Sequence, residues 1–511
     1  MRAKHLCALL LGLLALGGVS ALPASARRAV PTHGAAHAGP TVTAALASLQ
    51  RSGAISDAAY QQDYAAYLAA KRSLAKLSGT RRTELGAVLS NVQAIAAAGG
   101  FIASRLGALF LTLERNWQWW TTEPLLSDGE RVSFPPSKLI WQYYAGQGLQ
   151  IQWLATFGEA NGYYLSGHEN ANLRQLLSEA IPLASTRAGG IAWEYMFSFD
   201  GSRPPWTSGL SQGTALQVLS RAWSRFKEPA DLTAAQQALG IFEVAPPAGV
   251  RVSTPAGALY AEYTYAPADR ILNGFIQALV GLYEYASITK DPLGLKLFEE
   301  GDAEARLEVP HYDTGAWSLY DQFGESDLNY HELLTEFLQH LCERTRMGPP
   351  FTEASAQAPS STPAPAAGTP GSSSSVGASA GGASAASAGE GNASIAQASS
   401  PILADQIYCT TAEDFTADLR TSPVLSLLST TLAAGARAGV QISLSKIATV
   451  QMTVRRDGRV VWTNTAVVER GRPKLLWPTP ARGGTFSVAL TATDLAGNFA
   501  TATGTILVKR H

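Results

Sequence analysis

Residues 259–289 read LYAEYTYAPADRILNGFIQALVGLYEYASIT and join two kinds of sequence. A polar segment that holds three tyrosines and Glu262 comes first. From Ile271 onward the apolar residues recur at three- and four-residue spacings and leave few polar positions, which is typical of a buried helix. The stretch therefore predicts a core helix that is entered through a connector rich in ionisable side chains.

Helical segments of this kind recur on both sides, with irregular connectors between them. They include LIWQYYAGQGLQIQWLATFGEA (139–160), LSQGTALQVLSRAWSRF (210–226) and NYHELLTEFLQHLCERT (329–345). Because successive helices follow without strands between them, we expect a mainly α chain, with an α/α toroid-like domain of helical hairpins over residues 124–419. Residues 41–123 predict more helices, broken at Gly99–Gly100, and the sequence leaves open whether they belong to the toroid.

The composition of the sequence changes twice after residue 352. Residues 353–400 are almost entirely Ala, Ser, Gly and Pro, which predicts a disordered insertion within the domain. From 424 to 511 apolar and polar residues alternate, with a hairpin signal at Asp457–Gly458, so we expect an immunoglobulin-like β-sandwich. This sandwich would bind a cell-wall or surface glycan, or space the protein from a surface.

The first residues predict export. Residues 1–26 combine a short basic start, an apolar run and a small-residue ASA site, which is the pattern of a signal peptide; a membrane anchor is the alternative. Residues 27–40 are expected to be disordered. Cys342 and Cys409 then remain, and an exported chain with two cysteines suggests one disulfide at the base of the insertion, with a reduced buried pair as the alternative.

Composition limits the partners. The net charge is -1 over 511 residues, so nothing in the composition favours nucleic acid, whose backbone needs a basic face on its partner. Two cysteines exclude a cysteine-based zinc cluster, and neither an EF-hand loop nor a glycine-rich nucleotide loop stands out. The oligomeric state is open.

Four stretches of the central region resemble the C-terminal domain of the D-glucuronyl C5-epimerases, which convert glucuronate to iduronate in heparan-type chains. They are PPWTSGLSQGTALQVLSRA (204–222), EYTYAPADRILNGFIQALVGLYEY (262–285), YDTGAWSLYD (312–321) and NYHELLTEFLQHL (329–341). Their order and spacing match the family over roughly residues 130–420. The sequence departs at Thr264, where the family has a proline, and at Arg270, where it has an apolar residue.

The resemblance implies an isomerase that acts on a uronate-containing, glycosaminoglycan-like polysaccharide with no organic cofactor; a structural calcium ion would also fit the resemblance. By position, the catalytic groups would be Glu262, Tyr263, Tyr320 and Tyr330. C5 epimerisation needs one acid/base group on each side of the sugar ring, and tyrosine and glutamate can supply them. We expect Glu262 and Tyr330 to flank C5, although the roles of the four residues can be permuted.

Each of these residues also has a structural explanation. A tyrosine at a helix entry can simply pack its ring and bond its hydroxyl, and Glu262 can be an exposed charge before a helix. Four further residues are candidates for substrate binding, with a core or surface role as the alternative: Trp206, Gln212, Arg270 and His331. Arg270 would pair with the uronate carboxylate, or else form a surface salt bridge.

Two other functions remain. The same carbanion could expel the C4 oxygen, which would make the protein a polysaccharide lyase. Alternatively, the protein could be a non-catalytic glycan-binding protein of the cell surface.

Overall fold

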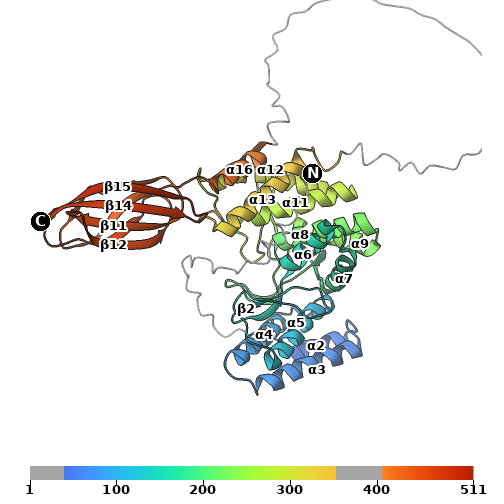
Figure 1. Ribbon diagram of the computed structural model, residues 1–511. Helices are drawn as coiled ribbons and strands as arrows, with labels where there is room; N and C mark the ends of the chain where they lie inside the picture. The colour runs from blue at the N-terminus through green and yellow to red at the C-terminus, as the bar shows by residue number, and fades with distance from the viewer. Residues whose placement is uncertain (1–38, 353–405, 510–511) are drawn as a thin grey trace, which may run out of the picture.

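The computed structural model describes residues 39–352 and 406–509, and its helices come first in the chain (Figure 1). The predicted signal peptide, most of the segment 27–40 and the predicted disordered insertion lie outside the described residues. Within the described residues, no helix is long and apolar enough to cross a membrane.

Four helices pack together near the start of the described chain. They are α2 (Val42–Arg51), α3 (Asp57–Leu74), α4 (Gly79–Ala97) and α5 (Ala103–Thr122). The last two are separated at the expected Gly99–Gly100 break, where Gly99 has a φ of +72°. Their buried side chains belong to the same apolar cluster as those of the later helices, so they share one continuous core with the toroid-like part.

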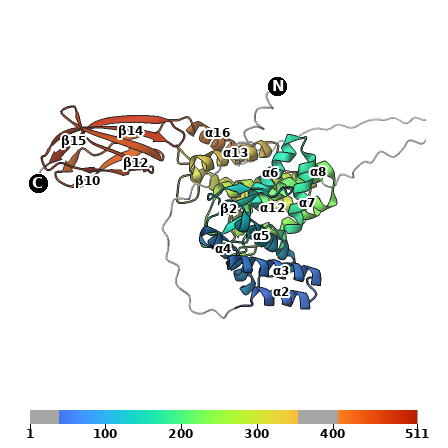
Figure 2. The ribbon, with the colours of Figure 1, turned by 60° about the horizontal axis from the view of Figure 1, so that its bottom comes forward.

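The later helices form an inner and an outer row. The inner row runs α6, α8, α11, α13, and each contacts the next. An outer helix follows each inner one in the chain and packs against it. The inner helices are α6 (Trp153–Ser166), α8 (Gly209–Phe226), α11 (Leu272–Thr289) and α13 (Leu328–Thr345); the outer ones are α7 (Asn170–Ala180), α9 (Pro229–Ala238), α12 (Pro292–Glu308) and α16 (Gln406–Asp418). This arrangement confirms a domain of stacked helical hairpins (Figure 2).

The expectation that no strands separate these helices is wrong. Short hairpins and one three-stranded sheet lie in the connectors, together with the short helices η1 (Ile181–Leu183), α10 (Gly240–Glu243) and η2 (Val309–Tyr312). The strands are β1 (Arg131–Val132), β2 (Trp141–Tyr144), β3 (Gly148–Ile151), β4 (Ser185–Arg187), β5 (Gly190–Ala192), β6 (Arg251–Ser253) and β7 (Ala258–Tyr260).

The largest error falls on residues 139–152, which were expected to begin a helix but form the β2–β3 hairpin. Gly146 and Gly148 turn the chain with φ values of +78° and +75°, and a Cβ on Gly148 would lie 2.5 Å from Oδ1 of Asn116. Asn116 accepts from the amide of Leu149 at 2.7 Å and donates to its carbonyl at 2.6 Å. The hairpin is therefore stabilised by α5, whose proximity is not visible in the local sequence.

The C-terminal part is a sandwich of two sheets. One has the order β13-β10-β8 and the other β12-β11-β14-β15-β9, and a second, separate apolar core lies between them. The expected Asp457–Gly458 turn joins β11 to β12, with both residues at positive φ (50° and 76°). The strands are β8 (Leu425–Leu427), β9 (Thr431–Ala433), β10 (Arg437–Leu444), β11 (Ala448–Arg456), β12 (Arg459–Val468), β13 (Lys474–Pro478), β14 (Gly484–Asp494) and β15 (Phe499–Lys509). Its immunoglobulin-like relationship stays a prediction.

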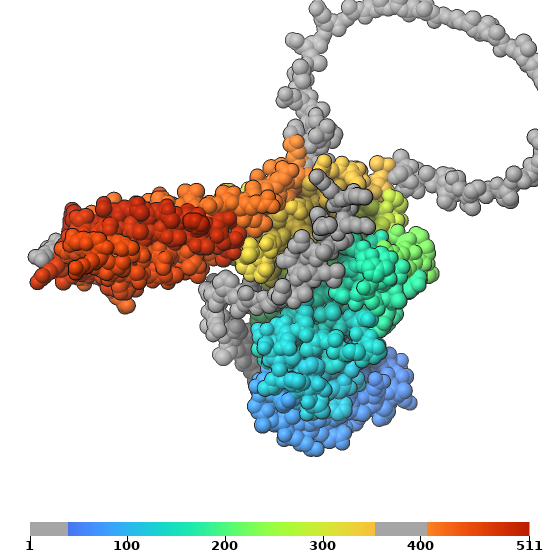
Figure 3. All heavy atoms as spheres, viewed as in Figure 1, coloured from blue at the N-terminus to red at the C-terminus, as the bar shows by residue number. Residues whose placement is uncertain are grey.

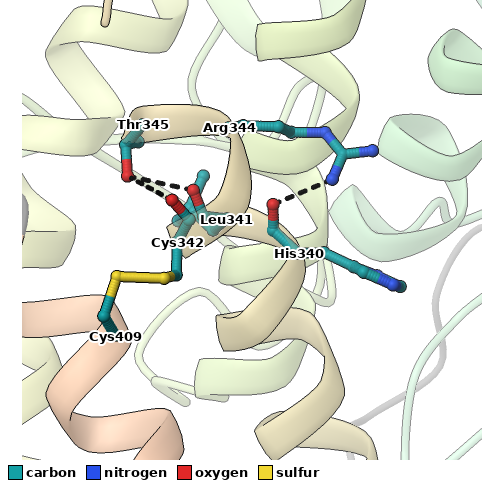
Figure 4. Close-up of a disulfide and its surroundings, with 6 residues drawn as sticks. All are labelled: His340, Leu341, Cys342, Arg344, Thr345 and Cys409. Atoms are coloured by element: carbon teal, nitrogen blue, oxygen red, sulfur yellow. Dashed lines mark hydrogen bonds between the residues drawn. A yellow bond between two sulfur atoms is a disulfide. The ribbon is translucent and has the colours of Figure 1, made fainter. Parts of the chain in front are cut away.

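The sandwich extends from the α13 and α16 end of the helical part (Figure 3). A disulfide joins Cys342, near the end of α13, to Cys409, near the start of α16, and this is the pair expected from the sequence (Figure 4). The bond closes a loop with a sequence separation of 67 residues. It fastens α16 to the inner row although a long segment separates the two helices in the chain.

We expect the replacement of both Cys342 and Cys409 by alanine to lower the free energy of unfolding by about 4 kcal/mol, because the open loop gains entropy in the unfolded chain. Urea unfolding of the wild-type and variant proteins measures the difference. Reductant should lower wild-type stability to that of the variant and leave the variant unchanged; equal stability of both proteins without reductant would contradict the prediction.

Candidate active site

Glu262 lies on the connector between β7 and α11, and this connector is bonded to the residues that precede α8. The amide of Gly209 donates to the carbonyls of Ala261 and Glu262 at 3.2 and 3.1 Å. The amide of Thr264 donates to the carbonyl of Thr207 at 3.1 Å, and the Thr264 hydroxyl accepts from the Thr207 amide at 3.2 Å. Thr264 therefore makes two hydrogen bonds that a proline, without an N–H or a hydroxyl, could not make at this position.

The Glu262 carboxylate is buried against the first turn of α11. The residue is 7% exposed, and a Cβ built on Gly274 would lie 2.1 Å from its Oε2. That oxygen has no hydrogen-bond partner among the described residues. Burial raises the pKa of Glu262 to about 7, and the nearby Tyr263 hydroxyl opposes the rise. Near neutral pH the group can therefore both hold and release a proton.

Three tyrosines extend from Glu262 in a row. The Tyr263 side chain lies within hydrogen-bonding reach of Glu262 and of Tyr320, and Tyr320 lies within reach of Tyr330. The ring centroids of Tyr320 and Tyr330 are 4.7 Å apart. All three tyrosines are partly exposed, so the row reaches from a buried carboxylate to the surface. The structure thus brings together the four residues that the sequence proposed as catalytic.

The tyrosine hydroxyls are protonated at neutral pH. Burial and the negative charges of Glu262 and Asp327 raise the pKa of Tyr330 to about 12. Burial and the Glu262 charge raise the pKa of Tyr263 and of Tyr320 as well. The row therefore combines one group that titrates near neutrality with three proton donors.

Tyr320 and Tyr330 are held by the loop between η2 and α13, residues 313–327, which we call the tyrosine loop. Oδ1 of Asp321 accepts from the amides of Phe323 and Gly324 at 2.8 and 2.9 Å, so it orders the turn, as Asp commonly does. The Tyr320 amide donates to the Gly324 carbonyl at 2.9 Å. Asp327 caps α13 by accepting from the Tyr330 amide at 2.9 Å.

His331 supports this loop from beneath. It is fully buried, and its ring stacks on that of Trp317 at a centroid distance of 3.7 Å. Nδ1 accepts from the Ser318 amide at 3.2 Å and Nε2 bonds to the Phe415 carbonyl at 3.0 Å, so the neutral ring carries its proton on Nε2. Burial lowers its pKa to about 4. A supporting role replaces the predicted substrate contact, because both ring nitrogens are bonded within the protein.

Gln212 and Arg270 are also engaged by the protein. Gln212 is fully buried, and its Nε2 donates to the Trp193 carbonyl and the Thr207 hydroxyl at 3.1 and 3.0 Å. Arg270 bonds to Glu308 and lies 3.7 Å from Glu304. The structure thus favours the salt-bridge alternative for Arg270, and it places the Gln212 amide below the surface rather than against a sugar.

Trp206 lies beside the tyrosine row but is only 4% exposed. It stacks on Tyr195 at a centroid distance of 4.3 Å and meets Tyr263 and Tyr265 edge-on at 5.7 and 5.3 Å. Its Nε1 donates to the Phe197 carbonyl at 2.8 Å. Trp206 therefore packs against the Tyr263 ring and limits its movement. A direct contact between Trp206 and a sugar stays a prediction.

Tyr144 lies close to Tyr330, although the spacing of polar and aromatic residues in 141–153 favours a core role for it. Burial and the neighbouring Tyr330 raise the pKa of Tyr144, and the Tyr144 hydroxyl accepts from Nε2 of Gln152 at 3.0 Å. The Arg131 guanidinium is close enough to counter the rise. The apolar pattern of residues 139–152 predicts a helix with this tyrosine in the core, whereas the Gly-Gln-Gly sequence at 146–148 is the local signal for the hairpin.

Among residues 39–352 and 406–509, no group of three or more histidine, cysteine or acidic side chains is arranged to hold a metal ion. The expected chemistry does not call for one.

Residues 188–355 match the family described as D-glucuronyl C5-epimerase C-terminus, which confirms the resemblance seen in the four motifs. The D-glucuronyl C5-epimerase of Caenorhabditis elegans is 30% identical over 131 residues, which cover 23% of this chain and 21% of that protein. An uncharacterized protein of Methanocaldococcus jannaschii is 28% identical over 151 residues, 28% of this chain and 49% of the relative. The matches thus span between a fifth and a half of these relatives.

Gly274 gives a test of how tightly Glu262 is enclosed. Alanine is normally favoured over glycine inside a helix by about 1 kcal/mol. We expect Gly274→Ala to lower the free energy of unfolding by about 1–3 kcal/mol instead, since the new methyl group would overlap the Glu262 carboxylate.

Gly162→Ala in α6 is the matched control, since a Cβ there meets no atom within 4 Å and should stabilise the protein. Urea unfolding measures both variants. Equal stabilisation by the two substitutions would show that Glu262 is not enclosed as described.

Proposed function

On the premise that residues 188–355 carry a D-glucuronyl C5-epimerase C-terminal domain, we propose that this protein is a carbohydrate epimerase that inverts C5 of a polymer-linked uronate. The observation that carries the proposal is the row from Glu262 through Tyr263 and Tyr320 to Tyr330. It offers a carboxylate that titrates near pH 7 and a separate hydroxyl donor, which are the two kinds of group that proton exchange at one carbon needs.

The reaction breaks one C5–H bond and forms another. A base on one face removes the proton from C5, and the electron pair spreads into the adjoining carboxylate of the sugar. An acid on the opposite face then gives a proton to C5, so the product is an isomer with no change in atoms. Ionised Glu262 and protonated Tyr330 suit these roles at neutral pH for one epimer. The reverse reaction starts from the opposite protonation states, with Tyr330 ionised as the base and Glu262 protonated as the acid.

Turnover leaves Glu262 protonated and Tyr330 deprotonated, and the enzyme must return the proton. Tyr263 and Tyr320 lie between the two groups and within hydrogen-bonding reach of their neighbours. Their hydroxyls provide a relay from Glu262 back to Tyr330. The Tyr144 hydroxyl, with Arg131 and Gln152 behind it, is a candidate donor to the sugar carboxylate as negative charge builds there.

The proposal extends to where the protein acts. Export by the signal peptide expected in residues 1–26 would bring the enzyme to a uronate-containing polysaccharide at or beyond the cell surface. The sandwich would then be in reach of wall or surface glycans.

Deuterium exchange tests the proposed function. The protein is incubated with uronate polymers in D2O, and nuclear magnetic resonance follows deuterium entry at C5 and the appearance of the epimer. We expect exchange with the wild type and a loss of about 100- to 10,000-fold in Glu262→Gln and Tyr330→Phe, as for the removal of a general acid or base.

Tyr64→Phe in the remote helix α3 is the control and should keep wild-type exchange. Wild-type exchange in both Glu262→Gln and Tyr330→Phe would reject the assignment. An unsaturated uronate, detected by its ultraviolet absorbance, would instead identify a lyase.

The rate should depend on pH through Glu262. Because the base must be ionised and its pKa is about 7, kcat/KM should rise through neutral pH and level off above it. Tyr330, with a pKa of about 12, stays protonated over this range. A profile measured from about pH 5 to about pH 9 that is flat, or that falls as pH rises, would contradict the assignment of Glu262.

A further inference from the structure

One end of the sandwich contacts the elements that carry the tyrosine row. The turns that connect β10 to β11, β12 to β13 and β14 to β15 all lie at this end. From the last of them, Nδ2 of Asn498 donates to the carbonyl of Leu419, just after α16, at 3.0 Å. The sandwich is thus joined to the helical part by specific polar contacts as well as by the chain.

Lys446, in the turn between β10 and β11, is the centre of this contact. Its side chain is 1% exposed, and Nζ lies 2.9 Å from Oδ2 of Asp494, which is equally buried. Nζ also donates to the carbonyls of Asp418 and Thr421 at 2.8 and 2.6 Å, at the C-terminal end of α16. A buried ammonium is costly unless it is paired and bonded, and a helix C-terminus favours a cation. The Lys446 side chain is therefore held in this one position by its ion pair and its two hydrogen bonds to carbonyls.

The same ammonium lies 5.2 Å from the centroid of the Trp317 ring, within the range of a cation–π contact. Trp317 also stacks on His331, the residue after Tyr330, at a centroid distance of 3.7 Å. His331 in turn accepts from the amide of Ser318, two residues before Tyr320. A series of packed groups thus connects Lys446 to residues that lie one or two positions from Tyr320 and Tyr330 in the chain.

A second contact supports the loop independently. The Glu325 side chain is 6% exposed and lies 3.7 Å from Nε of Arg470, in the turn between β12 and β13. It also lies near the backbone amides of Arg470 and Ile447, and neither of its carboxylate oxygens has a hydrogen-bond partner within normal geometry among the described residues. Glu325 pairs with Leu319, the residue before Tyr320, through a β-bridge. The sandwich therefore holds the tyrosine loop at two points on either side of Tyr320.

We propose that this end of the sandwich is part of the active centre, and that Lys446 is a positioning residue for Tyr320 and Tyr330. The proposal rests on the proposed function for its catalytic consequence. If the sandwich serves only as a spacer or a glycan-binding module, substitution of Lys446 should leave the rate of C5 proton exchange unchanged.

The test uses the full-length protein with Lys446→Met combined with Asp494→Asn. The second substitution removes the carboxylate that would otherwise be left buried without a partner. Lys474→Met, at an exposed position on β13, is the matched control. Two quantities are measured: the C5 exchange kinetics, and amide hydrogen exchange of residues 312–331 by mass spectrometry.

We expect the double variant to have a kcat lower by about tenfold with KM nearly unchanged, because small misplacements of catalytic groups reduce the rate strongly. Amide exchange should become faster in residues 312–331 and not across the helical part. Lys474→Met should match the wild type in both measurements. Wild-type kcat in the double variant, or faster amide exchange spread evenly over the chain, would overturn the proposal.

The two proposals fail differently. If the wild type exchanges no proton with any uronate polymer, the proposed function is rejected. Amide exchange at residues 312–331 then decides by itself whether Lys446 positions the loop.

Discussion

The burial of one carboxylate, that of Glu262, is the constraint on which the site depends. Its neutral and ionised forms are nearly balanced because the first turn of α11 comes close to it, and a glycine at 274 is what permits that approach. In water the same group would be ionised at neutral pH and a weak base. The packing of a connector against a helix thus creates a group suited to proton transfer.

The pKa values of the three tyrosines depend on the charge of Glu262 and on the neighbouring tyrosines. Their pKa values are raised by burial and by Glu262, so they stay protonated and can act as donors. They also come from different elements: Tyr263 from the connector before α11, Tyr320 from the tyrosine loop and Tyr330 from the first turn of α13. The row exists only because α11 and α13 are neighbours in the inner row of helices.

The support of the site reaches beyond the matched family region. Behind Tyr330 lie a buried histidine and a tryptophan, and behind these an ammonium that comes from the sandwich. The disulfide holds α16, whose C-terminal carbonyls receive that ammonium, against α13. The helical part and the sandwich, which differ in sequence composition, are therefore joined through a few buried polar side chains.

The sequence by itself determined the helical periodicity, the two-part organisation, the Asp457–Gly458 turn and the four residues of the tyrosine row. The first three follow from local patterns of apolar and turn residues, whereas the four residues of the row were assigned by resemblance to the motifs of the D-glucuronyl C5-epimerases. Tertiary structure alone decided that residues 139–152 form a hairpin, since their polar groups are satisfied by Asn116 and its neighbours on earlier helices. It also decided that His331 and Gln212 are supports and that Arg270 is paired, because burial and long-range partners leave no mark in the local sequence.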